Sequence, residues 1–123
     1  MSKHIFTIIR KIRKLEQERG RILNSLLVPN PLLIGSVSRV KRTCGKPNCR
    51  CAEKPSHEVW TLATSKEAHR RCQVVRQADV NAVQERVAVY KDFRAALRRL
   101  EAIRTEEKSL LRGLMEKRDV PYE

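Results

Sequence analysis

The sequence predicts an α+β, mainly helical fold. A long helix at each end is expected to pair as an antiparallel coiled-coil hairpin, with a small three-stranded antiparallel sheet and a cysteine loop between them. Three observations predict it: a heptad-like apolar seam near the N-terminus, short β-branched segments around a turn-rich loop, and a long final stretch without proline. We expect one folded unit with three segments, at 1–28, 32–76 and 79–117.

The N-terminal segment has the pattern of a helix running from about Ser2 to Leu27. Its apolar residues recur at alternating spacings of three and four, interrupted only at Arg19, as in the a/d seam of a coiled coil. Pro29 and Pro31 end the helix, since proline cannot continue the hydrogen-bond ladder. The predicted partner or oligomer seam on the two helices comprises Ile5, Ile8, Ile12, Leu15, Ile22, Leu97, Leu100 and Ile103.

The middle segment is expected to form three strands. Residues 32–40 are short, apolar and β-branched, and they lead into the cysteine loop. Residues 59–63 and 70–75 follow, joined by the polar turn at 64–68. We expect these strands to make one antiparallel sheet.

The last segment predicts a long amphipathic helix from Asp79, a suitable N-cap, to about Lys117. Its apolar residues repeat at threes and fours, with one phase slip near Phe93. A small sheet cannot cover such a helix, so we expect the helix to pair with the first helix. The apolar residues that remain uncovered are expected to contact a second chain.

The charge points to a polyanionic partner. The chain of 123 residues has 27 Lys+Arg and 14 Asp+Glu, a formal net charge of +13. Residues 1–57 carry +10 of this charge and residues 58–123 carry +3. Such an excess favours nucleic acid, with contacts drawn mostly from the first half.

The segment RTCGKPNCRCAEKPSH, residues 42–57, has the donors of a zinc site. Cys44, Cys49, Cys51 and His57 supply three thiolates and an imidazole, which suit a closed tetrahedral zinc ion. Gly45, Pro47 and Asn48 are turn formers that bend the chain between the first two thiols. Two alternatives stay open: Cys72 in place of His57, or no metal, with the cysteines as packing residues or free thiols.

The same region is rich in cations that can contact phosphates. Glu53 is the one acidic residue within the loop. The predicted nucleic-acid contacts are Arg39, Lys41, Arg42, Lys46, Arg50, Lys54, Arg70 and Arg71.

The octapeptide CGKPNCRC, residues 44–51, followed by a histidine, a strand pair and a long helix, resembles an uncharacterised family of small bacterial and archaeal proteins. The resemblance spans about residues 32–111. It implies a mobile-element context, since members of that family are often found among transposases. The sequence departs from the family at 58–62, where Glu-Val-Trp-Thr-Leu stands in place of Gly-Pro and several tyrosines.

No motif indicates an enzyme: there is no Gly-rich phosphate loop, no HExxH and no carboxylate set around the cysteines. We therefore expect a DNA-binding accessory protein, possessing a structural zinc and serving transposition or recombination with a recombinase or transposase as partner. The alternatives are an adaptor whose helices bind a helical or acidic protein, and a thiol switch. Without a membrane-spanning apolar run, we expect a cytoplasmic protein that is nucleoid-associated when bound to DNA.

Overall fold

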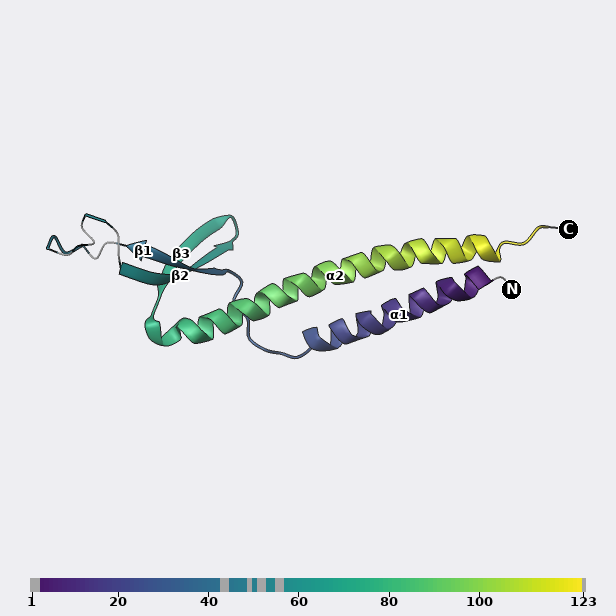
Figure 1. Ribbon diagram of the computed structural model, residues 1–123, viewed down its shortest axis with the longest axis horizontal. Coiled ribbons are helices and arrows are strands. Elements are labelled where there is room, and N and C mark those ends of the chain that lie inside the picture. Colours follow the sequence, from purple (N-terminus) through teal and green to yellow (C-terminus); the bar gives the residue numbers. More distant parts are fainter. Residues whose placement is uncertain (1–2, 43–44, 49, 51–52, 55–56, 123) are drawn as a thin grey trace. The chain divides into compact units, whose positions relative to one another are not determined.

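The computed structural model describes all residues except 1–2, 43–44, 49, 51–52, 55–56 and 123. Its elements, in chain order, are α1 (Lys3–Leu26), β1 (Ser36–Arg42), β2 (His57–Lys66), β3 (His69–Val75), the short 3-10 helix η2 (Gln77–Asp79) and α2 (Val80–Arg118) (Figure 1). They form two compact units. Unit 1 contains residues 1–29 and 93–123, and unit 2 contains residues 30–92.

Unit 2 is built on an antiparallel sheet with strand order β1-β2-β3. Ser36 pairs with Ala63 at one end of β1, and Arg42 pairs with His57 at the other. β2 and β3 are joined by a two-residue turn, because Lys66 pairs directly with His69. The turn residues Glu67 and Ala68 have φ values of 51° and 66°, the left-handed conformation that such tight hairpins require. The turn is therefore tighter than the segment 64–68 that the sequence predicted.

One face of this sheet packs against the first turns of α2. Val37 and Trp60 line a small hollow of about 210 Å³ together with Val87 and Ala88 of the helix. Val80 and Val87 are buried, and the Leu33 N–H donates to the Arg86 carbonyl at 3.1 Å. The sheet and residues 80–92 therefore share a small apolar core within unit 2.

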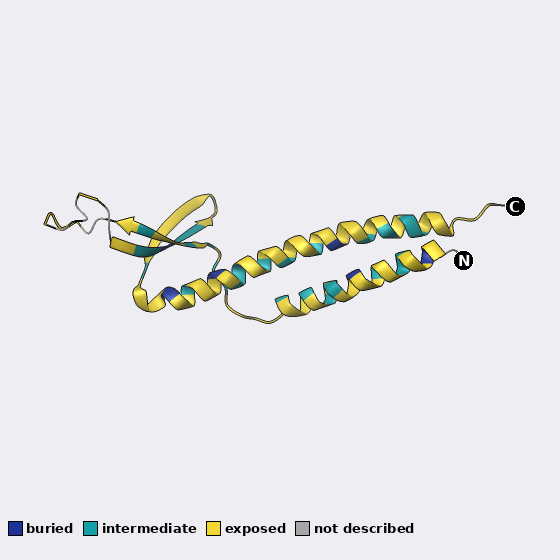
Figure 2. Ribbon diagram, in the orientation of Figure 1, coloured by how far each residue is buried: buried dark blue, intermediate teal, exposed yellow. Residues whose placement is uncertain are grey.

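Unit 1 pairs α1 with the second part of α2, and the two helices run antiparallel (Figure 1). Ile5 and Leu15 on α1 are buried, and Ile103 on α2 is fully covered. Figure 2 shows buried residues, in dark blue, on both helices. A Cβ placed on Gly113 would lie 3.8 Å from the Ile8 side chain. The Glu18 carboxylate and the Arg99 guanidinium form an ion pair between the helices.

The predicted fold class was wrong about the two helices. They are not a matched terminal pair, since α1 has 24 residues and α2 has 39, and residues 80–92 of α2 belong with the sheet. The chain is a helix–sheet–helix arrangement with unequal helices.

The physical reason is a change of phase along α2. Its less exposed positions in unit 2 include Val80, Val83, Val87 and Tyr90, at spacings of three and four. Beyond Phe93, where the helix passes into unit 1, the less exposed positions include Ala96, Leu100 and Ile103, whereas Leu97 is 51% exposed. A continuous seam cannot run along a helix whose covered face changes in this way.

Candidate nucleic-acid interface

The strand register separates the predicted cations of the sheet into two sets. Side chains alternate between the faces of a strand, so Arg39 and Lys41 lie on the face of Trp60, while Arg42 lies on the opposite face. On β3, Arg71 is on the Trp60 face and Arg70 is on the other. All five of these side chains belong to exposed residues. The sheet therefore presents positive charge on both faces.

Arg39 is already engaged within the sheet. Its Nη2 lies 2.9 Å from Oε2 of Glu58, and its guanidinium lies over the Trp60 ring, 5.5 Å from the centroid. The ion pair offsets its charge and the ring contact holds the guanidinium in place. Arg39 is therefore the least available of the predicted phosphate contacts on β1.

Arg70 and Arg71 are on β3, an edge strand whose residues are exposed except for the half-buried Val75. Neither arginine has a carboxylate partner among the described residues. When the Gln73 amide is turned so that its oxygen faces Arg71, this oxygen accepts hydrogen bonds from Nε at 2.7 Å and Nη2 at 3.2 Å. Arg71 is thus oriented without being neutralised.

The loop between β1 and β2 is described only in part. Gly45 has a φ of +80°, in the left-handed region that favours glycine, and the Glu53 N–H donates to the Arg50 carbonyl at 3.3 Å. Lys46, Arg50 and Lys54 are exposed. The predicted ligands Cys44, Cys49 and Cys51 lie outside the described residues.

The register distinguishes the two candidates for a fourth zinc ligand. His57 pairs with Arg42, at the strand ends from which residues 43–56 depart and to which they return. Cys72 is exposed and pairs with Ala63, six residues along β2 from His57, or about 20 Å at 3.3 Å per residue. His57 is therefore the candidate next to the loop. Within the described part of the chain, no three acidic, histidine or cysteine side chains gather as a metal site.

Sequence reasoning missed a second group of exposed cations, on the part of α2 in unit 1. Arg98, Lys108 and Arg112 are exposed and have no carboxylate partner among the described residues. By contrast, Arg99 pairs with Glu18 and Arg104 with Glu101. The sequence contains one signal for this group. Arg98, Thr105 and Arg112 are spaced by seven residues, and this spacing places side chains on nearly the same face of a helix.

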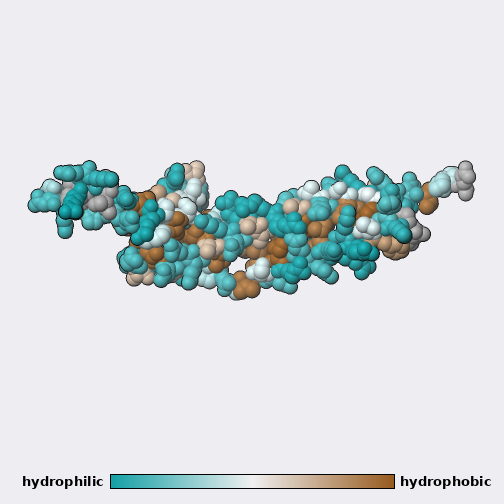
Figure 3. All heavy atoms as spheres, in the orientation of Figure 1, coloured by the Kyte–Doolittle hydropathy of each residue, from teal (hydrophilic) through white to brown (hydrophobic). Residues whose placement is uncertain are grey.

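Hydrophilic side chains cover most of the surface visible in Figure 3. Neither α1 nor α2, as far as they are described, has a stretch apolar enough to cross a bilayer.

A family model described as a domain of unknown function, DUF6788, matches residues 8–85. The chain belongs to this family.

The DUF6788 match spans most of α1, the whole sheet with its cysteine loop, and the first turns of α2. It thus includes every cation predicted from sequence to contact nucleic acid, and it ends before Arg98, Lys108 and Arg112. No curated protein and no solved structure matches the chain. The family description names no activity, so a functional argument for this DUF6788 protein depends on its own surface.

Proposed function

We propose that this protein is a DNA-binding accessory protein of the cytoplasm and nucleoid. Its sheet and cysteine loop contact the sugar–phosphate backbone. The observation that carries the proposal is the pair Arg70 and Arg71, two adjacent exposed cations on an edge strand without carboxylate partners among the described residues. Exposed cations without an acidic partner gain most from contact with a polyanion. The net charge of +13 supports the same partner.

The proposed contacts position the protein on DNA and do not read its sequence. Lys41, Arg42, Arg70 and Arg71 extend from the strands, and Lys46, Arg50 and Lys54 extend the charge into the loop. Long cationic side chains on strands and loops suit phosphate oxygens, which carry no base information. We propose no catalytic step. A role in transposition or recombination rests on the resemblance carried by residues 44–51.

We further propose that the loop holds a structural zinc ion through Cys44, Cys49, Cys51 and His57. The described donor fits, because His57 stands at the strand end where the loop rejoins the sheet. Four protein ligands leave no open position on zinc, so the ion would brace the loop and take no part in a reaction. The role of His57 is then to tie the loop to β2.

Binding of duplex DNA, measured by fluorescence anisotropy over a series of salt concentrations, tests the proposal. We expect affinity to fall steeply with salt, by about 0.9 in the logarithmic slope for each phosphate contacted. Arg70→Gln and Arg71→Gln should each weaken binding and reduce this slope. Arg104→Gln is the matched control, since it removes the same charge from a cation already paired with Glu101 at 3.7 Å. Affinity that does not vary with salt, or an equal loss in the control, would refute the proposal.

A second candidate function is an adaptor that binds a helical protein. The observation that favours it is the exposure of Leu97, Leu111 and Met115 on α2, which are 51%, 53% and 66% exposed. Such side chains can dock against an apolar helix face. A tight protein complex formed by a chain that is not retained on heparin or DNA would favour the adaptor over the DNA-binding protein.

A further inference from the structure

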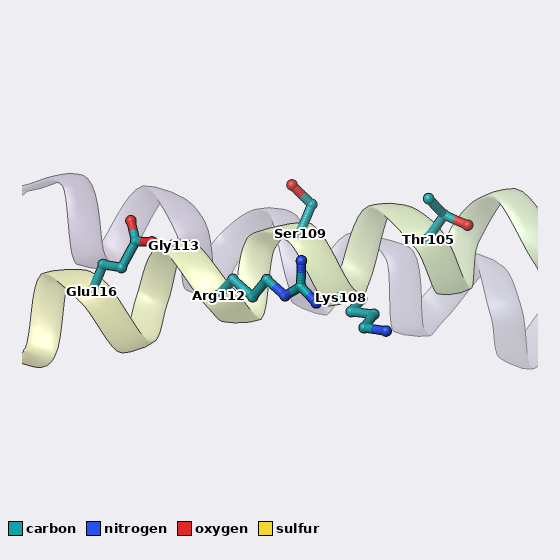
Figure 4. Close-up of a pocket in the computed structure, with 6 residues that line it drawn as sticks. All are labelled: Thr105, Lys108, Ser109, Arg112, Gly113 and Glu116. Carbon is teal, nitrogen blue, oxygen red and sulfur yellow. The ribbon is translucent and has the colours of Figure 1, made fainter.

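The surface of α2 in unit 1 contains a shallow hollow bordered by cations. Its volume is about 530 Å³, and it is lined by Thr105, Lys108, Ser109, Arg112, Gly113 and Glu116. Figure 4 shows Lys108 and Arg112 extending along the same side of the helix, with the Arg112 guanidinium directed toward Lys108. Two cations on the same side of a helix repel each other, and an anion placed beside them reduces that repulsion.

The spacing of these cations suits a chain of phosphates better than a single anion. Lys108 and Arg112 are four residues apart, or about 6 Å along the helix axis. One strand of duplex DNA carries a phosphate about every 3.4 Å along its axis, so the two side chains reach different phosphates. Arg98 lies fourteen residues before Arg112, and this spacing returns it to nearly the same face about 21 Å away.

The hollow also indicates which form of nucleic acid it fits. Its lining contains two hydroxyl side chains, two cations, a glycine and one carboxylate, and no aromatic ring. Proteins that hold single strands add aromatic side chains on which bases stack. A surface of hydroxyls and cations fits the sugar–phosphate backbone of a duplex, whose bases remain stacked.

We infer that Arg98, Lys108 and Arg112 form a second DNA-contacting surface, on α2 within unit 1, that holds the backbone of a duplex. The inference rests on the proposed function and adds a site to it. Two carboxylates lie near this surface. Glu101 pairs with Arg104, and Glu116, which lines the hollow, opposes an incoming phosphate.

The test compares DNA binding by the full chain with that of the double variant Lys108→Gln/Arg112→Gln. We expect the variant to bind duplex DNA more weakly and to reduce the logarithmic salt slope by about 2, one for each lost phosphate contact. Glutamine is a good helix former, so helix content by circular dichroism should not change. Arg104→Gln should leave the slope unchanged. This control is stringent because it removes a positive charge and also leaves the Glu101 carboxylate, which lies near the proposed surface, without its ion-pair partner.

A variant that binds duplex DNA more tightly provides a second test, because damage to the fold would weaken binding and not strengthen it. Glu116→Gln removes the opposing carboxylate from the hollow, and we expect it to tighten duplex binding. A single strand of the same sequence should bind more weakly than the duplex. Tighter binding of the single strand would overturn the duplex assignment.

The outcomes separate this inference from the function on which it rests. If Arg70→Gln weakens binding while Lys108→Gln/Arg112→Gln binds as the unmodified chain does, the α2 surface is refuted and the DNA-binding function stands. If the unmodified chain shows no salt-dependent binding to DNA, the proposed function fails and the inference fails with it.

Discussion

Glu107 on α2 faces Glu16 on α1, so two carboxyl groups meet between the helices of unit 1. Glu107 Oε1 is buried and has no hydrogen-bond partner among the residues that the structure describes. Burial raises the pKa of Glu107 above its ordinary value of 4.5, a hydrogen bond with Glu16 and the charge of Glu16 raise it further, and Arg19 opposes the shift. The contact between α1 and α2 therefore includes a group that is costly to ionise.

This carboxyl pair predicts a pH dependence of stability. Between the ordinary pKa and the raised one, the folded chain retains a proton that the unfolded chain has lost. The free energy of unfolding should therefore fall as pH rises through this window, and the full stabilisation should be present below the ordinary pKa. Glu107→Gln should remove this fall and raise the melting temperature at pH 7.

Thermal unfolding followed by circular dichroism from pH 4 to pH 8 checks this prediction. Glu85→Gln is the control, because Glu85 is an exposed residue on the same helix but in unit 2. A Glu107→Gln variant that melts with the same pH profile as the unmodified chain would contradict the prediction.

Two glycines predict opposite responses to alanine. A Cβ on Gly35 would lie 2.6 Å from the Ala63 carbonyl oxygen, closer than real Cβ contacts, so Gly35→Ala should force β1 and β2 apart. We expect a loss of about 1–3 kcal/mol. Gly20 lies within α1 with nothing within 4 Å of its Cβ position, so Gly20→Ala should stabilise by about 0.5–1 kcal/mol. Chemical denaturation measures both, and destabilisation by Gly20→Ala would show that the helix needs glycine there.

The ion pair between Arg99 and Glu18 predicts a measurable coupling between the helices of unit 1. Arg99 Nη2 donates to Glu18 Oε1 at 2.6 Å, and its Nε donates to the other oxygen. Hydrogen bonding to Arg99 lowers the pKa of Glu18, so the stabilisation is present above the ordinary pKa and is lost as pH falls through the lowered one. A double-mutant cycle with Arg99→Gln and Glu18→Gln should give a favourable coupling energy that declines with salt. Additive effects would show that solvent screens the pair completely.

The zinc proposal predicts loss of zinc from two single variants and retention of zinc in a third. We expect protein purified without added metal to hold a single zinc ion per chain, measured by elemental mass spectrometry. Cys49→Ser and His57→Ala should lose it. Cys72→Ser should keep it, because Cys72 lies opposite Ala63, far along β2 from His57. Loss of zinc from Cys72→Ser alone would contradict the proposed ligand set. Folded protein without zinc would refute the zinc site, and the DNA-binding proposal would then depend on the cations alone.

The sequence by itself determined the local elements. The 3-4 spacing from Ile5 to Leu26 predicted α1, and β-branched segments predicted three strands within a few residues of those observed. The absence of proline between Asp79 and Lys117 predicted α2. These patterns are local because the spacing of apolar residues along one helix or strand reflects which face of that element is covered. The basic residues of the loop and of β3 were also identified from the sequence, by the local abundance of lysine and arginine.

Only the tertiary structure decided which side of each element meets which partner. The covered positions of α2 pass from Tyr90 through Phe93 to Ala96 and leave Leu97 exposed, because the first part of the helix packs with the sheet and the second part with α1. Strand register put Glu58 and Trp60 beside Arg39, and helix pairing put Glu18 beside Arg99. These partners are separated by 19, 21 and 81 residues. Contacts over such separations depend on packing of the whole chain, which periodicity within one element does not encode.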